Sequence, residues 1–480
     1  MNEEKNKNKM NEEKSKNKRI MIALFVFTTI IFILIYLFFG TSVLDGIINF
    51  NSLVDDTNIS GIKLPGKTTD TTVKLNKNNV TINLGKTINL KATVKPKKST
   101  ITWTSSNNKI ATVKDGKVTS KRSGTVTIKA TVNGVSDECK VTIKGSRVHF
   151  ININESGDAI LLESNGHFAL VDAGNSGYTV SRKYFENYLN NLGIKTIDFM
   201  IITHNHDDHN GGAAWVMKKG FKVNTIYMKT YTGKDSSASA EMWDRYNDII
   251  STAENYGTKI VYVDKDSKFK ESSGKSGVIN LKEMRVYFFN TIQRLNSNGN
   301  GKPFNYYTSD NYAKNNGENL NSIVNLVRVN GHNVLLTGDL NDYNILKGVF
   351  DNKVKVVSNS KEKLDVYKLP HHANFNCTGN KKYSVKATYY VATTAIDLKF
   401  VSGGNGSGYR ISPKNINYGG KNVNSCFYLM NNKNKKNAKK MMCNTYYANN
   451  SDKAVVFNLT EKSIKVSGGG QGKDVSKRCK

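Results

Sequence analysis

The sequence predicts a membrane-anchored protein with two folded regions, a small all-β sandwich and a larger, strand-rich α/β domain with helices on the outside. Three patterns predict this. An uncharged apolar run fills residues 20–39, short segments that alternate apolar and polar residues fill residues 71–144, and strands alternate with helices over residues 147–468. A chain of 480 residues is long enough for two or three domains.

The N-terminal region predicts a membrane anchor. Residues 1–19 carry seven Lys or Arg and four Glu, whereas residues 20–39 carry no charge. A helix of this length spans roughly 30 Å, the thickness of the hydrocarbon core of a bilayer, and the apolar part of a cleaved signal peptide is usually only about 7–15 residues long. The basic flank is then cytoplasmic, and the rest of the chain lies at the cell surface. Residues 40–70 predict an extended spacer.

Residues 71–144 predict six or seven short strands with turns of Asn, Lys-Pro and Gly between them, which indicates a small β-sandwich. The segment also resembles the bacterial Ig-like group 2 domain, in the stretches ITWTSSNNKIATV and GKVTSKRSGTVTIKATV. Trp103 is expected to pack in its core. We expect a spacer or adhesion module without catalytic side chains.

The region 147–468 predicts strands and helices in alternation. Helical spacing occurs in VSRKYFENYLNNLG, with Gly193 as a stop, and in AEMWDRYNDIISTAENYG, and a basic tail follows at residues 469–480. The expected strands are RVHFININ, DAILLES, HFALVDAG, DFMIIT, IVNLVRVN, HNVLLTGD, KLDVYKLP, ATYYVATT and AVVFNLTEKSIKVS.

The stretch THNHDDHNGG follows the expected buried strand DFMIIT and holds three of the eight histidines. Neutral imidazole nitrogens and carboxylate oxygens are ligands that zinc accepts. Four such side chains within six residues, His204, His206, Asp208 and His209, suit two adjacent metal ions better than one. A structural zinc site would be a closed set of four ligands, usually with Cys, so this set predicts further ligands elsewhere in the chain.

Two later motifs supply candidates for those ligands. LLTGDL ends a strand with Asp339, and KLPHHANFN ends another with His371 and His372. The exits of strands are where an α/β scaffold presents its functional groups. Together with Asp172 in FALVDAG, and in this order, the motifs resemble the metallo-β-lactamase superfamily. The resemblance implies an αββα sandwich and a metal-dependent hydrolase.

The resemblance also implies two zinc ions that activate a water molecule. Asp208 would in addition orient that water or accept its proton, His371 would touch the substrate, and Asp172 would orient a ligand imidazole. The choice of His372 over His371 as a ligand stays open. The implied ligands are His204 and His206 for one ion, Asp208, His209 and His372 for the other, and Asp339 as the bridge.

One departure from the superfamily concerns the first metal ion. Many members have a further ligand histidine before the bridging aspartate, but the only histidine between His209 and Asp339 is His332, in an expected NGHN turn. The matching segment, ENLNSIVNLV, places Asn321 or Ser322 there. The first ion is therefore expected to be held less tightly or to be more open to substrate.

Longer segments of the region 147–468 are similar to the catalytic domain of teichoic acid phosphorylcholine esterases, among them TIYMKTYTG, EMWDRYNDIISTAENYG and ENLNSIVNLVRVNGHNVLLTGDLND. This similarity implies a cell-surface phosphodiesterase that acts on headgroups of wall or membrane polymers, such as phosphorylcholine. The segments GDAILL, TGDL and HH are more distantly similar to the metallo-β-lactamase domain of competence DNA-uptake proteins, so an extracellular nuclease is one alternative. A surface adhesin with a relic hydrolase domain is another.

Charge and aromatic residues bear on the partner. The net charge of +31 fits an anionic wall polymer or phosphodiester substrate and leaves nucleic acid open, but Lys and Asn are frequent throughout the chain. A quaternary ammonium headgroup would need an aromatic cage, for which Tyr227, Tyr231, Trp243 and Tyr246 are candidates. The spacing of Trp243 and Tyr246 favours core packing instead, and the chain lacks aromatic choline-binding repeats. The five cysteines are too sparse for a disulfide scaffold, and the predicted metal site uses none.

Overall fold

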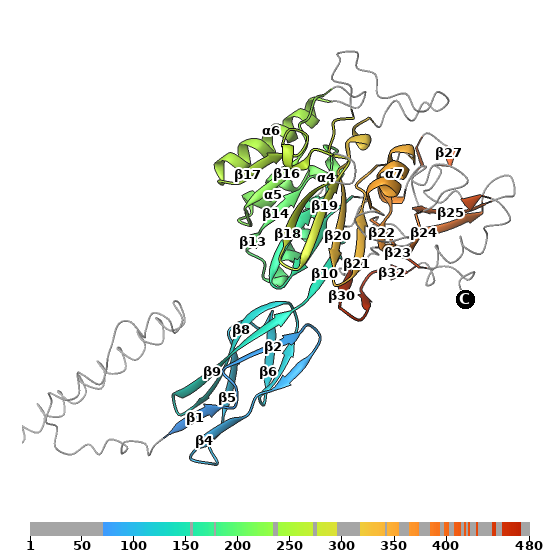
Figure 1. Cartoon of the computed structure of the whole chain (residues 1–480). Helices are drawn as coiled ribbons and strands as arrows, with labels where there is room; N and C mark the ends of the chain where they lie inside the picture. Colours follow the sequence, from blue (N-terminus) through green and yellow to red (C-terminus); the bar gives the residue numbers. More distant parts are fainter. Residues whose placement is uncertain are drawn as a thin grey trace, which may run out of the picture. The chain divides into compact units, whose positions relative to one another are not determined.

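The computed structural model describes residues 71–471 apart from internal gaps (Figure 1). The basic tail at residues 1–19, the expected membrane helix at 20–39, the spacer at 40–70 and most of the tail at 469–480 lie outside the described residues. Within the described part, no helix has the length and apolar character needed to cross a bilayer. The gaps are residues 154–156, 177–178, 234–238, 272–275, 295–316, 341–342, 355–363, 374–384, 394–397, 403–407, 414–416, 419–420, 423–428, 431–443 and 448–453.

Residues 71–144 form a β-sandwich of nine strands, more than the six or seven expected. The expected single strand INLKATV is divided because Leu90 is buried and its backbone N–H bonds to Gly116 O at 2.8 Å, so that the chain changes sheets there. Trp103 packs against the core, as expected. The strands are β1 (Thr72–Leu75), β2 (Asn79–Asn83), β3 (Thr87–Asn89), β4 (Ala92–Lys95), β5 (Thr102–Ser105), β6 (Ala111–Lys114), β7 (Lys117–Ser120), β8 (Gly124–Val132) and β9 (Val135–Lys144).

The following region contains two eight-stranded sheets, in the orders β17-β16-β14-β12-β11-β10-β30-β31 and β18-β19-β20-β21-β22-β23-β29-β32. Their facing sides share one apolar core. The first sheet consists of β10 (Ser146–Phe150), β11 (Ile160–Ser164), β12 (His167–Val171), β14 (Phe199–Ile201), β16 (Thr225–Met228), β17 (Lys259–Tyr262), β30 (Val455–Leu459) and β31 (Ile464–Ser467). The second consists of β18 (Gly277–Leu281), β19 (Met284–Phe289), β20 (Val324–Val329), β21 (His332–Leu336), β22 (Leu364–Lys368), β23 (Ala387–Ala392), β29 (Thr445–Tyr447) and β32 (Gly470–Gln471).

Helices cover the outer faces of both sheets, which gives the αββα sandwich that the resemblance implied (Figure 1). Along β11, Leu161 faces the helices whereas its neighbours Ile160 and Leu162 face the second sheet, because successive side chains of a strand point to opposite sides. On the first sheet lie α3 (Thr179–Leu192), α5 (Ala213–Lys218) and α6 (Ala240–Asn255), and on the second lies α7 (Tyr343–Val349).

The helix signals in the sequence correspond to observed ends. Gly193 adopts a φ of +68° directly after α3, a conformation that glycine takes without steric cost. Ser239 caps α6 by accepting a hydrogen bond from Met242 N at 3.3 Å. The remaining elements are short: α4 (Asp207–Asn210), η2 (Ser267–Phe269), η3 (Glu318–Asn321), η4 (Phe350–Val354), η5 (Pro370–Ala373), β13 (Thr196–Ile197), β15 (Lys222–Val223), β24 (Leu398–Ser402), β25 (Gly408–Pro413), β26 (Asn417–Tyr418), β27 (Lys421–Asn422) and β28 (Leu429–Met430).

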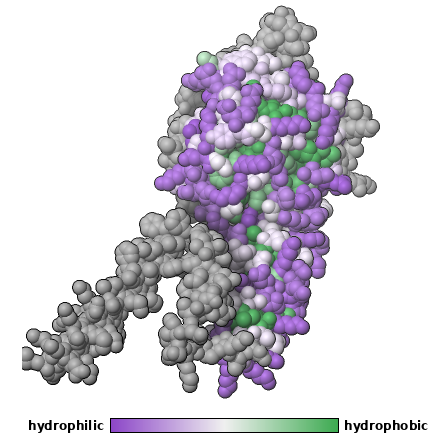
Figure 2. Space-filling view, turned by 90° about the vertical axis from the view of Figure 1, so that its left-hand side faces the viewer, coloured by the Kyte–Doolittle hydropathy of each residue, from purple (hydrophilic) through white to green (hydrophobic). Residues whose placement is uncertain are grey.

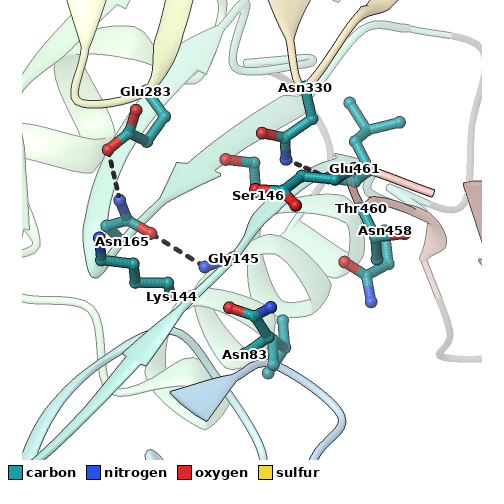
Figure 3. Close-up of a pocket in the computed structure, with 12 residues that line it drawn as sticks. Asn83, Lys144, Gly145, Ser146, Asn165, Glu283, Asn330, Asn458, Thr460 and Glu461 are labelled. Atoms are coloured by element: carbon teal, nitrogen blue, oxygen red, sulfur yellow. Dashed lines mark hydrogen bonds between the residues drawn. The ribbon is translucent and has the colours of Figure 1, made fainter. Parts of the chain in front are cut away.

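The β-sandwich and the αββα region meet around the single residue that separates β9 from β10, Gly145. The backbone N–H of Gly145 donates to Asn165 Oδ1 at 2.9 Å, beside a pocket of about 200 Å³ lined by residues of both regions (Figure 3). None of the predicted metal-site residues lines this pocket. It contributes to the junction and lies apart from the residues that the sequence singled out.

A buried carboxylate crosses the same junction. Glu163 is fully buried and accepts hydrogen bonds from Ser123 Oγ at 2.6 Å and from Arg147 Nε at 2.7 Å, and it contacts His149 Nε2 at 3.1 Å. Burial alone would raise the pKa of Glu163, but the contacts with His149, Arg147 and Ser123 outweigh it and lower the pKa to about 2. Burial lowers the pKa of His149, so this histidine is a neutral structural partner.

We predict that Glu163 makes stability depend on acid pH. Because its pKa falls from 4.5 to about 2 on folding, ionised Glu163 contributes stability above pH 4.5, and this contribution is lost as the pH falls towards 2. The variant Glu163→Gln should therefore unfold at a lower temperature at pH 7 and lose less stability than wild type between pH 4.5 and 2. Thermal unfolding followed by circular dichroism tests this. Glu138→Gln, which removes an exposed carboxylate, should keep the wild-type slope, and equal slopes for all three proteins would contradict the prediction.

Candidate metal centre

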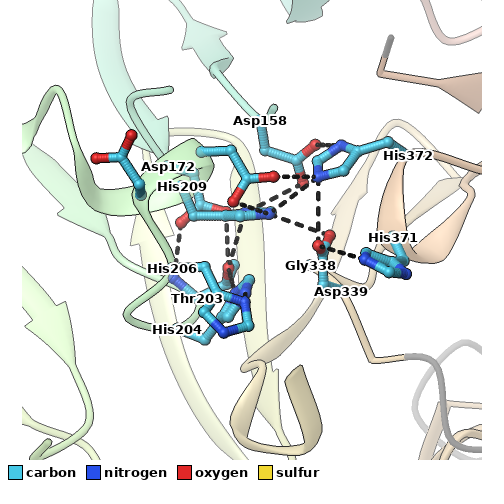
Figure 4. Close-up of polar contacts among 12 residues, drawn as sticks. Asp158, Asp172, Thr203, His204, His206, His209, Gly338, Asp339, His371 and His372 are labelled. Carbon is cyan, nitrogen blue, oxygen red and sulfur yellow. Dashed lines mark hydrogen bonds and ion pairs between the residues drawn. The ribbon is translucent and has the colours of Figure 1, made fainter. Parts of the chain in front are cut away.

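The candidate site lies where parallel strands of both sheets end. In the first sheet β12 and β14 run parallel, and Asp172 and the His204–Asn210 segment follow them directly. In the second sheet β21 and β22 run parallel, and Asp339 and the two adjacent histidines follow them. Since the carboxyl ends of parallel strands lie at one edge of a sheet, the fold brings together motifs that are far apart in sequence (Figure 4).

Four of the predicted residues form one compact group. Donor atoms of Asp208, His209, Asp339 and His372 all lie within 4.8 Å of one another. His209 Nε2 lies 3.1 Å from Asp339 Oδ1 and 3.3 Å from His372 Nε2, which in turn lies 2.9 Å from Asp208 Oδ2. Two carboxylates and two imidazoles thus point their electron pairs at a common centre.

This arrangement fits a divalent cation. His209 Nε2 and His372 Nε2 face each other at 3.3 Å, and Asp339 Oδ1 is buried beside His209 Nε2 at 3.1 Å. Buried carboxylates need a positive partner because the interior solvates charge poorly. Two imidazole nitrogens and two carboxylate oxygens are a donor set that zinc accepts.

The electrostatics of the group agree with this reading. Burial would lower the pKa of His372, but Asp339 and Asp208 outweigh it and raise the pKa to about 9. Burial would likewise raise the pKa of Asp339, but His209 and His372 hold it well below its usual range. The carboxylates are therefore ionised at neutral pH, and the group binds positive charge, whether as protons or as a metal ion.

His204 and His206 form a second pair beside this group. His204 Nε2 and His206 Nδ1 face each other at 3.1 Å, and the ring centroids of His204 and His209 are 4.2 Å apart. Burial holds the pKa of His204 well below its usual value, so its imidazole is neutral, as a metal ligand requires. All four candidate ligands of the THNHDDHNGG stretch, His204, His206, Asp208 and His209, thus lie next to one another.

Asp172 orients His209 through the ring nitrogen that faces away from the group of four. Its Oδ2 contacts His209 Nδ1 at 2.7 Å, and its carboxylate also accepts hydrogen bonds from the backbone and the hydroxyl of Thr203, both at 2.7 Å. The side chain is fully buried. Because Nδ1 is engaged, Nε2 is the nitrogen that His209 turns toward the group of four.

The two adjacent histidines have different surroundings. His372 is 2% exposed, its Nδ1 lies 3.1 Å from Thr393 O, and its Nε2 belongs to the group of four. His371 is 15% exposed at its side chain, and its Nε2 lies 3.9 Å from Asp339 Oδ2. Both residues adopt a φ near +50°, which costs non-glycine residues of order 1–3 kcal/mol each. This strained turn directs the two rings differently.

Many superfamily members have a further ligand histidine where this chain has Asn321 or Ser322. Neither residue supplies a further ligand to the pair His204 and His206. Ser322 Oγ lies 3.4 Å from His204 Nδ1, the nitrogen that points away from His206, and accepts a hydrogen bond from Asp339 N at 3.0 Å. Asn321 is engaged with Glu318 and with the backbone of Arg294. His332 bonds to Thr460 O at 2.8 Å in a turn, as expected for a structural residue.

Two buried residues beside the group did not stand out in the sequence. Asp158 Oδ1 lies 3.5 Å from His372 Nδ1, and Asp158 Oδ2 lies 2.6 Å from Lys368 Nζ. The available signals were an aspartate directly before the buried strand in GDAILL and a lysine inside the apolar exit KLPHH. A second cluster, Asp158, Asp172 and His209, has metal-like spacing, but the Lys368 ammonium already neutralises one of its carboxylates.

We predict that Asp172→Asn weakens zinc binding by about 10–100-fold, the usual effect of losing the acceptor that orients a ligand histidine. Competition with a chromogenic chelator measures the affinity. Asp198→Asn is the matched control, because Asp198 contacts His167 at 2.9 Å in a partly exposed pair that touches none of the predicted ligands. An equal loss in both variants, or no loss in Asp172→Asn, would contradict the orienting role.

Comparisons with known proteins agree with the two regions. Residues 70–143 match the family model of the bacterial Ig-like domain, group 2, and residues 153–243 match that of the metallo-β-lactamase superfamily. The second match includes Asp172 and the THNHDDHNGG stretch and ends before Asp339. No curated protein sequence matches the chain.

Three of the similar solved structures share only low identity with the chain. They are a variant of the CmlA β-hydroxylase (15% identity, 48% of this chain and 36% of that one, TM-score 0.27), a metallo-β-lactamase from Cronobacter sakazakii (12%, 46% and 75%, 0.25) and an archaeal metallo-β-lactamase superfamily protein from Sulfolobus tokodaii (16%, 41% and 63%, 0.21). The aligned part is about a third of the β-hydroxylase and under two thirds of the archaeal protein. The chain thus contains a segment that matches the group 2 bacterial Ig-like domain, followed by one that matches the metallo-β-lactamase superfamily.

Proposed function

We propose that this chain is a dinuclear zinc hydrolase that cleaves phosphodiesters, with headgroups of wall or membrane polymers, such as phosphorylcholine on teichoic acid, as its substrates. The observation that carries the proposal is the group Asp208, His209, Asp339 and His372 with the pair His204 and His206 directly beside it. The superfamily match supports a metal-dependent hydrolase. The phosphodiester is proposed from the similarity of longer segments to phosphorylcholine esterases.

The ligands would be divided unequally between the two ions. One ion would be held by Asp208, His209 and His372, and the other by His204 and His206, with Asp339 shared. Because neither Ser322 nor Asn321 supplements the pair, the second ion would keep more positions open for substrate oxygens.

Two bound divalent ions would lower the pKa of a water molecule and stabilise the charge that develops on phosphoester oxygens. Asp208 is 30% exposed at its side chain and is the accessible carboxylate of the group. His209 and His372 hold its pKa far below the usual range against the opposing effect of burial, so it would orient the attacking water as a hydrogen-bond acceptor. Burial lowers the pKa of His371 to about 4, so at neutral pH this ring is uncharged and able to hydrogen-bond a substrate oxygen.

The proposed location is the cell surface. Residues 20–39 would anchor the protein as a single membrane span, with both domains outside and the Ig-like domain between membrane and enzyme. Residues 71–144 contain fourteen Lys and one Arg against three acidic residues, and the face in Figure 2 is largely hydrophilic. Such an excess of positive charge would favour encounters with an anionic polymer.

Within the candidate aromatic cage, Tyr231 and Tyr246 are packed as core, whereas Trp243 is 39% exposed. The ring centroids of Tyr231 and Trp243 are 4.8 Å apart, those of Tyr231 and Tyr246 are 5.8 Å apart, and both tyrosines are buried. Tyr227 belongs to a different cluster, with Phe269 at 5.6 Å between the two sheets. Tyr227 therefore lies in a different cluster from the other three aromatic residues, and the four do not form one cage.

The extracellular nuclease is the second candidate, favoured by the positive charge and by the similarity to competence proteins in GDAILL, TGDL and HH. A surface adhesin with a relic hydrolase domain is the third. The adhesin is disfavoured by the compact group of ionisable ligands, because buried carboxylates without a role would be costly to retain.

We predict that the zinc-loaded full chain hydrolyses p-nitrophenyl phosphorylcholine, and that Asp208→Ala lowers kcat at least about 100-fold, as expected for a group that orients the nucleophile. Release of p-nitrophenol is the readout. Bis-p-nitrophenyl phosphate and single-stranded DNA are tested beside it, and Asp207→Ala, which alters the neighbouring carboxylate of the same motif, is the control.

The outcomes separate the candidates. Cleavage of the generic diester without the choline ester would keep the phosphodiesterase and reject the headgroup. Fastest cleavage of DNA would favour the nuclease. Wall binding without hydrolysis of any ester, unchanged after metal removal, would favour the adhesin.

A further inference from the structure

A fully buried lysine lies beneath the candidate metal centre. Lys368 is the last residue of β22, and its side chain is 0% exposed. Its Nζ lies 2.6 Å from Asp158 Oδ2 and 2.8 Å from Gly338 O. A third oxygen, Asp339 Oδ1, lies at 3.6 Å. The ammonium is thus held between two carboxylates, one of which is the proposed bridging ligand.

Asp158 connects this lysine to the other ligands. Its backbone N–H donates to Asp208 O at 3.0 Å, and its Oδ1 lies 3.5 Å from His372 Nδ1. Gly157, directly before it, has room for no side chain, because a Cβ there would lie 2.7 Å from Asp208 O. The Asp158–Lys368 pair therefore contacts the segments that carry three proposed ligands, from both sheets.

Lys368 acts on the turn that presents Asp339. It bonds to the carbonyl of Gly338, whose φ of +50° marks a tight turn, and it attracts the carboxylate of the next residue. The two oxygens of Asp339 are thereby directed apart, Oδ1 toward Lys368 and His209, and Oδ2 toward His372 at 3.2 Å. Because each oxygen of Asp339 meets a different ligand histidine, the rotation of its carboxylate decides how the ligands are arranged.

We propose that Lys368 is a positioning residue, which fixes the orientation of the bridging carboxylate Asp339 and adds a permanent positive charge to a centre crowded with acidic groups. The proposal rests on the proposed metal-dependent function. A purely structural lysine would only neutralise Asp158. The two roles differ in one respect: removal of both partners of the ion pair should be tolerated if the role is structural, and should still impair metal binding if Lys368 positions Asp339.

The experiment compares metal binding by the full chain and its variants. In Lys368→Gln with Asp158→Asn, the buried charge pair is replaced by neutral groups of similar shape, so no unpaired charge remains. We expect the double variant without metal to unfold within a few degrees of the wild-type temperature. Its zinc affinity should fall at least about ten-fold at one of the two sites. Its kcat should fall by a larger factor than its KM changes. Calorimetric zinc titration, thermal unfolding with chelator and steady-state kinetics give the three readouts.

Two further variants keep the test decisive. Lys229→Gln removes another buried lysine, which donates to Ile292 O at 2.8 Å and contacts none of the ligands, and it should leave zinc affinity unchanged. Lys368→Arg keeps the charge beside Asp158 and alters the approach to Asp339, so it should fold yet bind zinc several-fold more weakly. The arginine variant provides the answer if the double variant fails to fold.

The results distinguish the two levels of inference. Wild-type zinc affinity in both the double variant and Lys368→Arg would overturn the positioning role and leave the hydrolase proposal standing. Failure of the wild-type chain to bind zinc at all would overturn the proposed function and the positioning role with it.

Discussion

The candidate metal centre, at the edge where the parallel strands of both sheets end, depends on the contact between Asp339 and His209. His209 follows a strand of the first sheet and Asp339 follows a strand of the second, and their atoms meet at 3.1 Å. This closeness requires the two sheets to pack face to face with their parallel strands ending at the same edge. The apolar core between the sheets thus sets the distance between His209 and Asp339.

The same contact explains why a cation suits the site. Asp339 is buried among imidazoles and is near two further carboxylates, Asp208 and Asp158. The interior compensates part of this charge by itself, through Lys368 and through protonation of His209 and His372, whose pKa values are raised. A metal ion would displace the protons but not the ammonium. The centre therefore combines one fixed positive charge, the Lys368 ammonium, with ligand atoms that can exchange protons for a metal ion.

Local patterns were sufficient to predict most of the architecture. The alternation of strands with helices, the two principal helices and the placement of the THNHDDHNGG stretch after a buried strand followed from periodicity. The αββα sandwich and the pairing of the distant motifs followed from the family resemblance. The number of strands in the sandwich was predicted too low, because apolar and polar residues alternate without interruption along INLKATV. The chain nevertheless passes from one sheet to another at Leu90. Alternation reports which side chains are buried, not which sheet a strand joins.

Lys368 and Asp158 could not be predicted from pattern because their partnership is a tertiary one. Lys368 ends a strand of the second sheet, whereas Asp158 lies in the loop that precedes β11 of the first sheet. Each alone has a plainer interpretation: a lysine at a strand end and an acidic residue in a loop. His371 and His372 were ambiguous for a related reason. Adjacent residues normally point in opposed directions along a strand, but here both lie in a left-handed turn that no period describes.

The single-residue link at Gly145 has a consequence for how the enzyme region could be studied by itself. A fragment that begins at residue 147 would lose Ser123, which bonds to buried Glu163, and Arg122, which stacks on Phe168 at 4.9 Å. It would also start within β10, next to the centre of the first sheet. The Ig-like domain thus contributes part of the surface against which the hydrolase completes its packing, and a minimal active fragment would need to start near residue 71.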